Sequence, residues 1–172
     1  MIKLAITGGI GSGKSYIARQ MTQLLGIPVY DSDANAKRLN EEHPGIRSGL
    51  LEMVGKDVYD AQGHLDKAVL ARFLFASEEN ALRVNALVHP VVKADFLRWA
   101  EAQTAPVVAI ETALLAESGI DKLVDKVIRV DAPLETRISR AMQRDGVNRE
   151  KILERIARQQ EYPNPDIIIN NV

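Results

Sequence analysis

Short apolar runs occupy the two ends of the chain and are missing from its middle. Leu4–Thr7 and Ile27–Tyr30 have the character of buried strands, and three further runs follow at Pro106–Ile110, Lys126–Val130 and Asp166–Ile169. Strands of this kind that alternate with helices are typical of a parallel sheet covered on both faces. The pattern therefore predicts an α/β fold with a five-stranded parallel sheet.

Helical patterns separate these strands. Lys14–Leu25 repeats apolar residues at helical spacing and is followed by Gly26, the residue type that commonly closes a helix. Near the C-terminus, helices are predicted at Pro133–Gln143 and Arg149–Gln160, and Asn148 is suited to cap the second of them. Predicted helices and predicted strands therefore alternate along the chain.

The middle of the chain, residues 41–105, is dominated by helical patterns. The clearest are Lys67–Phe75 and Glu78–Ala102, with Ser77 as the expected cap of the second. Pro90 lies inside that second pattern and is expected to kink or split the helix. We therefore expect a helical lobe inserted between strands.

The domain organisation follows from this contrast. The chain has 172 residues, enough for one domain with a buried core. We expect a core made of residues 1–33 and 106–172, a helical lobe at about 34–105, and a short helical lid at about 137–160.

Composition narrows the class of protein. Apolar residues make up 46% of the chain and charged residues 26%, as in ordinary soluble globular domains. The formal net charge of −1 gives no reason to expect nucleic acid or a membrane as a partner. The chain has no cysteine, which excludes disulfides, thiolate metal sites and cysteine catalysis. The apolar start is broken by Lys3 and by glycines, so we expect no secretory signal. The absence of cysteine fits the cytoplasm, and we expect a monomer, with an oligomer as the open alternative.

A glycine-rich loop between the first strand and the first helix carries the strongest chemical signal. Gly8–Ser15 reads GGIGSGKS and fits the pattern G-x-x-x-x-G-K-[ST], here called the phosphate loop. Its glycines allow successive N–H groups to point inward at an anion, and the following helix turns its positive end towards the same place. Lys14 is expected to reach the β- and γ-phosphates and Ser15 to bind Mg²⁺. The alternative is a simple strand-to-helix turn.

Carboxylates follow two of the predicted strands. Asp31 and Asp33 come after the second strand, and Glu111 ends the third, with Glu117 a few residues later. Ligands of open parallel sheets bind at this carboxyl edge. Asp33 is therefore a candidate to orient or deprotonate an attacking hydroxyl, and Glu111 to bind metal through water or to orient an acceptor. Helix capping and ordinary loop acidity are equally good explanations from position alone.

Three arginines share one face of the predicted helix that begins at Pro133. Arg137, Arg140 and Arg144 are spaced i, i+3 and i+7, and an arginine-rich helix follows the next turn. Two basic helices joined by a turn could close over a nucleotide, since guanidinium groups meet phosphate oxygens in pairs. The alternative is a solvated face with partners such as Glu135.

A phosphate loop alone does not name the reaction. The guanine-reading N-K-x-D of switch GTPases is absent, and motor ATPases usually have longer chains. The sequence therefore favours a kinase for small molecules. A kinase acting on a nucleoside or nucleoside monophosphate, and a nucleotide-dependent switch without transfer, remain the alternatives.

Taken together, these residues resemble the dephospho-CoA kinase family, whose members catalyse the last step of coenzyme A synthesis. The resemblance runs from Ile2 to Asn170. The segments that carry it are Thr7–Ser15, Asp31-Ser32-Asp33, Leu87-Val88-His89-Pro90, Leu114-Leu115-Ala116-Glu117, Val130-Asp131-Ala132-Pro133, Arg144-Asp145-Gly146 and Asp166–Asn170.

The resemblance implies a three-layer P-loop kinase fold and transfer of the γ-phosphate of ATP, with Mg²⁺, to the ribose 3′-hydroxyl of dephospho-CoA. It implies catalytic roles for Asp33, Lys14 and Arg140, with Ser15 as metal ligand. The residues expected to bind ATP are Gly9, Ile10, Gly11, Ser12, Gly13, Lys14, Ser15, Tyr16, Arg140 and Arg144. The residues expected to bind the acceptor are Thr7, Asp33, His89, Glu111 and Leu114. Without the resemblance, His89 would be taken as a structural residue beside Pro90.

Two features depart from the family pattern. Members usually have Asp-x-Pro where this chain has Glu111-Thr112-Ala113, which puts the role of Glu111 in doubt. Members also usually continue with a helix after the last strand, whereas this sequence stops at Val172. We expect the sheet to be less covered near that strand, and the protein to melt lower than a version with the helix.

Overall fold

The computed structural model describes residues 1–172 and divides into two compact units. The first unit consists of Met1–Asp31 and Ala100–Val172, and the second of Ser32–Trp99. The first contains every strand, while the second is helical except for an isolated bridge between Tyr59 and Leu65. None of the helices has both the length and the apolar character needed to cross a bilayer.

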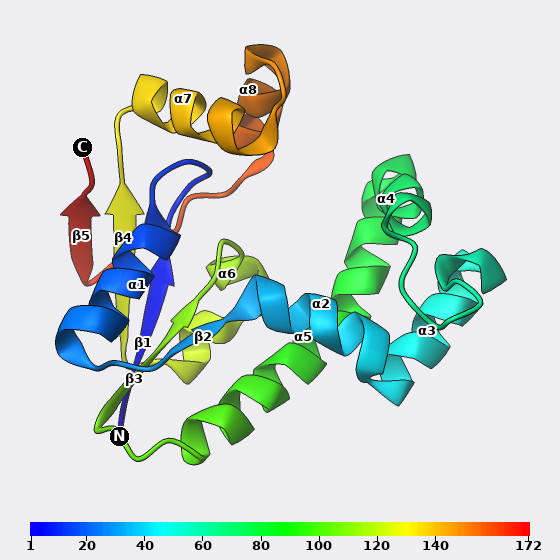
Figure 1. Ribbon diagram of the computed structural model, residues 1–172, viewed down its shortest axis with the longest axis horizontal. Helices are drawn as coiled ribbons and strands as arrows, with labels where there is room; N and C mark the ends of the chain where they lie inside the picture. Colours follow the sequence, from blue (N-terminus) through cyan, green and yellow to red (C-terminus); the bar gives the residue numbers. More distant parts are fainter. The chain divides into compact units, whose positions relative to one another are not determined.

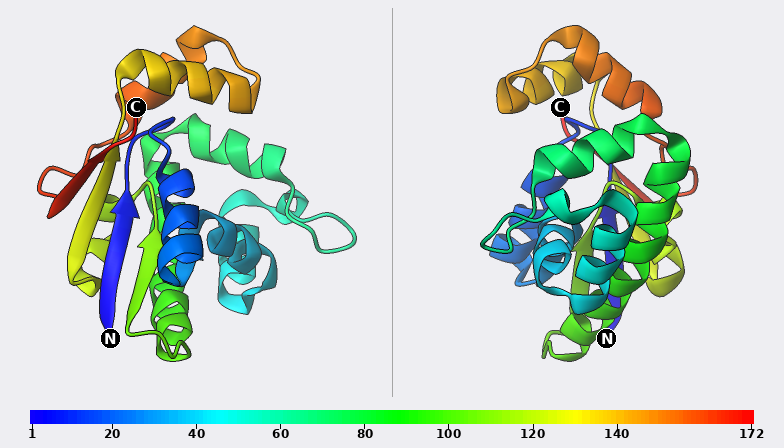
Figure 2. Two further views of the ribbon diagram at one scale, coloured as in Figure 1. Left: turned by 60° about the vertical axis from the view of Figure 1, so that its left-hand side comes forward. Right: turned by 90° about the vertical axis from the view of Figure 1, so that its right-hand side faces the viewer.

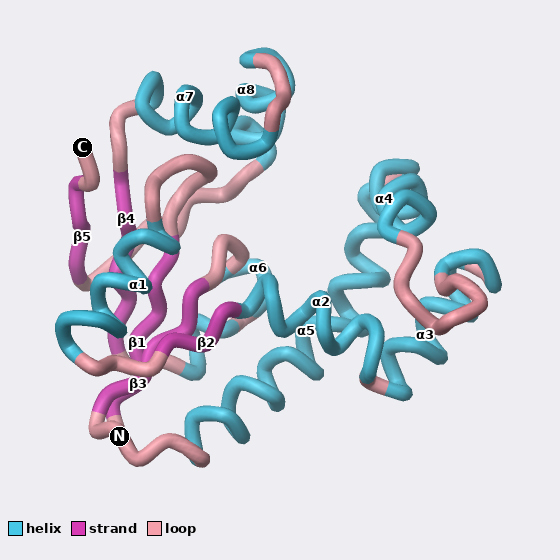
Figure 3. Tube along the Cα trace, viewed as in Figure 1, coloured by secondary structure: helices cyan, strands magenta, loops and turns pink.

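The first unit is built on a five-stranded sheet in which all strands run parallel, in the order β2-β3-β1-β4-β5 (Figures 1 and 3). Its strands are β1 (Ile2–Thr7), β2 (Val29–Asp31), β3 (Val107–Glu111), β4 (Lys126–Asp131) and β5 (Ile167–Asn170). The predicted α/β class and strand number are therefore confirmed, and the boundaries differ by one or two residues at most ends.

Helix α1 (Lys14–Leu25) covers one face of this sheet. Its buried Ala18 packs in a cluster with Ile6 of β1, Ala109 of β3 and Val130 of β4. Successive residues of a strand point to opposite faces, so the fully buried Ala5, Val108 and Ile110 face the other side. Both faces of the central strands are thus covered, whereas Ile167 and Ile168 of the edge strand β5 are about half exposed, at 51% and 49%.

The carboxyl ends of the strands meet at one edge, and two helices lie beyond it. Register places Ile6 beside Glu111 and Glu111 beside Asp31. The views in Figure 2 show helices α7 (Leu134–Asp145) and α8 (Arg149–Arg158) beyond this edge, after the end of β4. The short helix α6 (Leu115–Ser118) and the 3₁₀ turn η2 (Ile120–Leu123) lead from β3 to β4. The fold thus collects the strand ends where a nucleotide would bind.

The second unit contains α2 (Ser32–Glu42), α3 (Pro44–Val54), the 3₁₀ turn η1 (Lys56–Val58), α4 (Lys67–Ala76) and α5 (Glu78–Glu101) except for the last two residues of α5, which belong to the first unit. Side-chain caps begin several of these helices: Asp66 accepts from Ala68 and Val69, and Ser77 accepts from Asn80, as the sequence predicted for Ser77.

Pro90 does not split its helix, so of the two predicted alternatives, a kink or a split, the split is excluded. Helix α5 runs without interruption from Glu78 to Glu101 with Pro90 inside it. A proline removes one hydrogen bond from the helix, but burial of an apolar stripe on both sides of it holds the remaining turns together. That stripe consists of Val84, Val88, Val92, Phe96 and Ala100, spaced four residues apart and nearly or fully buried.

Candidate active site

The phosphate loop joins β1 to α1 and uses backbone angles that only glycine adopts without strain. Gly11 and Gly13 have φ values of 74° and 91°. A side chain on Gly9 would also collide with the guanidinium of Arg137. Gly13 precedes α1 without any side-chain cap, so the first N–H groups of the helix stay available for an anion.

Ser15 and Glu111 meet at the first turn of α1. The Ser15 hydroxyl donates a hydrogen bond to the Glu111 carboxylate at the end of β3. Asp31, the register partner of Glu111, lines the same hollow of about 400 Å³, together with Arg19. Lys14, the residue before Ser15, is half-buried and forms no ion pair. The structure therefore brings a hydroxyl and two carboxylates to the mouth of the phosphate loop.

This set of oxygen atoms suits Mg²⁺ that arrives with a nucleotide. Mg²⁺ is usually held by one or two carboxylates together with phosphate oxygens and waters. No group of three or more His, Cys, Asp or Glu side chains is placed to hold a metal by itself. Ser15 and Glu111 would therefore supply part of a coordination shell, and the phosphates and waters the rest.

Two arginines of α7 hold the phosphate loop by its carbonyl groups. Arg137 Nε donates to the Ile10 carbonyl at 3.0 Å. Arg140 Nη1 donates to the Ser12 carbonyl at 3.4 Å and to that of Asn171 at 3.2 Å, and Asn171 Nδ2 donates to the same Ser12 carbonyl at 3.0 Å. Both arginines belong to the helix face that the sequence singled out. That Arg140 binds ATP stays a prediction, and Arg137 was not among the residues expected to bind ATP.

Ile10, at the tip of the phosphate loop, contacts the α7–α8 segment through its N–H, its carbonyl and its side chain. Its N–H donates to Gln159 Oε1 at 2.7 Å, and its carbonyl accepts from Arg137. Its side chain packs against the buried cluster of Ile138 and Ile152 that joins α7 to α8. Sequence reasoning missed Gln159, because a glutamine at the end of a predicted helix gives no signal of a contact 149 residues away.

Arg144 makes its hydrogen bonds away from the phosphate loop. Its Nε and Nη2 both bond the carboxylate of the adjacent Asp145, which Arg155 of α8 also reaches at 2.9 Å. The hydrogen bond from Arg144, followed by the nearby charge of Arg155, lowers the pKa of Asp145. Arg144 thus stabilises the α7–α8 turn. Tyr16, another expected ATP contact, is 50% exposed on α1.

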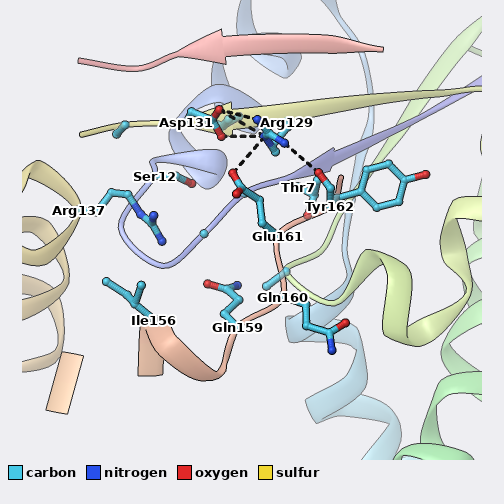
Figure 4. Close-up of a pocket in the computed structure, with 15 residues that line it drawn as sticks. Thr7, Ser12, Arg129, Asp131, Arg137, Ile156, Gln159, Gln160, Glu161 and Tyr162 are labelled. Atoms are coloured by element: carbon cyan, nitrogen blue, oxygen red, sulfur yellow. Dashed lines mark hydrogen bonds and ion pairs between the residues drawn. The ribbon is translucent and has the colours of Figure 1, made fainter. Parts of the chain in front are cut away.

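A second hollow, of about 330 Å³, opens beside Gly8 and Gly9 (Figure 4). Thr7 lines it from β1, and Ala113, next to the candidate Leu114, lines it from the other side. Its floor contains Arg129, which hydrogen-bonds the Asp131 carboxylate and the Tyr162 carbonyl and forms an ion pair with Glu161. The Asp131 hydrogen bond raises the pKa of Arg129. Thr7 and the Leu114 segment are thus brought near one polar hollow.

The remaining candidates, Asp33 and His89, belong to the second unit. Asp33 lies in the first turn of α2, is exposed, and has neither a hydrogen bond nor an ion pair. His89 lies half-buried on α5. Along the chain, Asp33 follows Asp31, the last residue of β2, by two positions.

Comparison with known proteins agrees with this geometry. A family model described as dephospho-CoA kinase matches residues 2–171. The dephospho-CoA kinase of Porphyromonas gingivalis is 46% identical over 160 residues, which cover 93% of this chain and 78% of that protein. The dephospho-CoA kinase of Bacteroides fragilis is 42% identical and is covered over 77% of its length.

Solved structures show the same fold. The crystal structure of TT1252 from Thermus thermophilus has a TM-score of 0.85 at 33% identity and covers 99% of this chain and 88% of its own. A shikimate kinase from Bacteroides thetaiotaomicron, at 14% identity and a TM-score of 0.56, covers 98% of this chain and 85% of its own and shares the fold alone. The phosphate loop, the parallel sheet and the match over nearly the whole sequence lead to one conclusion: this chain belongs to the dephospho-CoA kinase family.

Proposed function

We propose that this protein transfers the γ-phosphoryl group of ATP to the 3′-hydroxyl of the ribose in dephospho-CoA, giving coenzyme A and ADP. The observation that carries the proposal is the family match over residues 2–171. The geometry of the phosphate loop supports the donor side, and the free carboxylate of Asp33 supports the acceptor side.

On the donor side, the loop amides and the uncapped start of α1 bind the β- and γ-phosphates. The ammonium group of Lys14 has no partner in the protein and is free to neutralise charge that develops on the transferred group. Arg140 uses only Nη1 for the carbonyls of Ser12 and Asn171, so its other N–H groups remain for a phosphate oxygen. Arg137 acts indirectly, by holding Ile10 in place.

Ser15 and Glu111 hold Mg²⁺ in this proposal. The chemistry that Mg²⁺ would supply at these two residues is neutralisation of negative charge on the phosphate groups. The hydrogen bond between Ser15 and Glu111 supports the metal role for Glu111, one of the two roles that the sequence left open, over the acceptor role that the resemblance implied. The longer side chain, compared with the aspartate usual in the family, reaches Ser15 directly.

On the acceptor side, Asp33 orients the ribose hydroxyl and accepts its proton. The transition state of phosphoryl transfer is largely dissociative, so alignment of the hydroxyl matters more than the strength of the base. An exposed carboxylate without protein partners is available for this hydrogen bond. Transfer joins the hydroxyl oxygen to phosphorus and breaks the bond between phosphorus and the oxygen bridging to ADP, while the proton goes to Asp33.

A panel of acceptors tests this proposal. The protein, ATP and Mg²⁺ are incubated in parallel with dephospho-CoA, AMP and adenosine, and products are identified by mass spectrometry. We expect a phosphorylated product with dephospho-CoA alone. Transfer only to AMP or adenosine would show a nucleoside or nucleotide kinase instead, and ADP release without any phosphorylated acceptor would show a nucleotide-dependent switch.

A further inference from the structure

The peptide group between Gly9 and Ile10 in the phosphate loop is held at both ends. Its carbonyl, which belongs to Gly9, accepts a hydrogen bond from the Ser12 N–H at 3.1 Å. Its N–H, which belongs to Ile10, donates to Gln159 Oε1 at 2.7 Å. Rotation of this peptide would break both hydrogen bonds, so Gln159 helps to set the shape of the loop.

Gln159 is also fixed through its own backbone. It ends helix α8, and its N–H donates to the Ile156 carbonyl at 3.2 Å. Figure 4 shows its side chain directed from the end of α8 towards the phosphate loop, beside Arg137. Gln159 is half-buried, whereas the next residue, Gln160, is exposed. A side chain that is fixed at both ends loses little further freedom when a ligand binds to it.

The oxygen and the nitrogen of the Gln159 amide have different tasks. Because the Ile10 N–H needs an acceptor, the amide presents its oxygen to the loop, and its nitrogen is turned away from Ile10. This nitrogen, Nε2, carries two donor N–H groups, and neither is bonded within the chain. Gln159 therefore has two donors left for a ligand.

The hollow of about 330 Å³ beside the phosphate loop is the space that Gln159 lines. Ser12 also lines it, and the buried hydroxyl of Ser12 has no hydrogen-bond partner. Buried polar groups are rarely left unpaired, so this hydroxyl also indicates a polar occupant. The charge of Arg129, in contrast, is already matched by Asp131 and Glu161. Gln159 and Ser12, at the phosphate loop, thus keep free polar groups where Arg129 does not.

This hollow lies between the groups expected to hold the two reactants. Gly8 and Gly9 of the phosphate loop line it. Thr7, a candidate for binding the acceptor, and Ala113, the neighbour of the candidate Leu114, line it as well. A phosphoryl group in transfer passes from the donor to the acceptor, so its path leads through the space between these residues. Its three equatorial oxygens carry negative charge and accept hydrogen bonds.

We propose that Gln159 is a further catalytic residue: its Nε2 donates hydrogen bonds to the oxygens of the phosphoryl group during transfer, while its Oε1 holds the loop. The inference rests on the proposed function. No proton leaves the amide: the bond between phosphorus and the oxygen bridging to ADP breaks, the bond to the ribose oxygen forms, and the proton of the hydroxyl goes to Asp33. A donor that is held in place before the reaction stabilises the charge of the transition state without reorganisation.

A comparison of two variants tests this role. Gln159→Met and Arg137→Ala each remove one hydrogen bond to the Ile10 backbone, but only Gln159→Met also removes the proposed contact with the phosphoryl group. Gln143→Met, at an exposed position of α7, is the control. The measurements are kcat at saturating ATP and dephospho-CoA and the KM for ATP, with melting midpoints as the check on folding.

We expect Gln159→Met to lower kcat by about 10²-fold, the lower end of the range for the loss of one donor to a transition-state oxygen. Arg137→Ala should instead raise the KM for ATP, and Gln143→Met should match the wild type. Gln159→Glu keeps an acceptor for Ile10 but has no donor, so it should lower kcat as Gln159→Met does, and it decides the question if Gln159→Met does not fold. Equal kcat values in folded Gln159→Met and Arg137→Ala, or a normal kcat in Gln159→Glu, would overturn the inference.

Failure of the proposed function would look different. If the wild type does not phosphorylate dephospho-CoA, the same variants are compared in transfer of the γ-phosphoryl group to AMP, adenosine or water at saturating ATP. A fall of that rate in Gln159→Met but not in Arg137→Ala would support the role of Gln159 without the proposed acceptor. Equal rates in the two variants, or no transfer by the wild type to any of these acceptors, would overturn it.

Discussion

The phosphate loop and the helical pair α7–α8 both take part in binding ATP in the proposed reaction, but they do so by different means. The loop offers backbone N–H groups, two glycines with positive φ and the uncapped start of α1. The helical pair offers side chains, Arg137 and Arg140 from α7 and Gln159 from the end of α8, which hold the loop. Backbone recognition fixes a short sequence pattern, whereas side chains that meet through tertiary packing leave none.

This difference leads us to expect unequal effects of substitution in the two regions. In the proposed reaction, each group of the loop would contact the phosphates that react, so its loss is expected to lower kcat. In the helical pair, a side chain that only holds the loop would act on the order of the phosphate site, so its loss is expected to raise KM. The predictions below are arranged by the size of effect that this contrast implies.

Lys14→Ala is expected to have the largest effect. Removal of a preorganised charge at the transferred group typically lowers kcat by about 10²–10³-fold. The measurement is kcat with saturating ATP and dephospho-CoA, and Lys122→Ala, at an exposed position of η2, is the matched control. A Lys14→Ala enzyme with nearly normal kcat would show that the loop binds an anion without catalysing its transfer.

Asp33→Asn should lower kcat by about 10²-fold, the lower end of the range for a positioned acid or base. The substitution keeps the size of the side chain and the first turn of α2 but removes the charge that accepts the proton. The affinity for ATP, measured by calorimetry, should not change. A loss of ATP affinity equal to the loss of turnover would contradict a role of Asp33 on the acceptor.

The sequence predicted these two residues with unequal support, and the reason is physical. Lys14 follows from the loop pattern, because the geometry of a phosphate nest needs glycines at fixed positions and a helix immediately afterwards. The five parallel strands and the caps at Ser77 and Asn148 could likewise be predicted, since each depends on neighbouring residues. Asp33 depended on resemblance to a family, because a carboxylate at a helix start is also an ordinary cap.

The contacts that were missed are those whose partners lie far away in the chain. Gln159 and Arg137 reach Ile10 across separations of 149 and 127 residues, and no local pattern records such a contact. Arg144 lies on the same predicted helix face as Arg137 and Arg140, but it donates its hydrogen bond to its neighbour Asp145. Periodicity identifies the face of a helix, but packing decides which positions of that face meet the loop. The hollow beside Gly8 and Gly9 was missed for the same reason.

Glu111→Gln tests the metal side of the loop. The amide keeps a hydrogen bond with Ser15 but removes the charge that would face Mg²⁺. We expect the Mg²⁺ concentration for half-maximal activity to rise about tenfold, with a smaller loss of kcat at saturating Mg²⁺. Activity is titrated with Mg²⁺ after chelator treatment. An unchanged Mg²⁺ requirement together with a raised KM for dephospho-CoA would show that Glu111 binds the acceptor and not the metal.

Arg137→Ala also affects the phosphate loop, and we expect its effect to be smaller than that of Glu111→Gln. It removes the hydrogen bond to the Ile10 carbonyl, so the loop tip becomes less ordered and the KM for ATP should rise about fivefold, as expected for the loss of one hydrogen bond. Arg144→Ala is the matched control on the same helix, because its bonds go to Asp145. Equal rises of the KM for ATP in both variants would show a general electrostatic effect of α7 rather than a specific hold on the loop.

The smallest effect is expected at the turn that joins the helical pair, where charge acts on stability and not on the reaction. Arg144 first and Arg155 second lower the pKa of Asp145 below its usual value of 3.8, so its contribution to stability is present above that value and is lost as the pH falls through the lowered pKa. Because such surface pairs contribute little, Asp145→Asn should lower the melting midpoint by only about 2 °C at pH 7. That gap should narrow as the pH approaches 3, whereas Glu52→Gln, at an exposed position of α3, should show no gap at either pH. A difference in melting midpoint between the wild type and Asp145→Asn that is equal at pH 3 and pH 7 would mean that Asp145 supports the turn by its shape. The charge at this end of α7 would then not contribute to holding the helices over the phosphate loop.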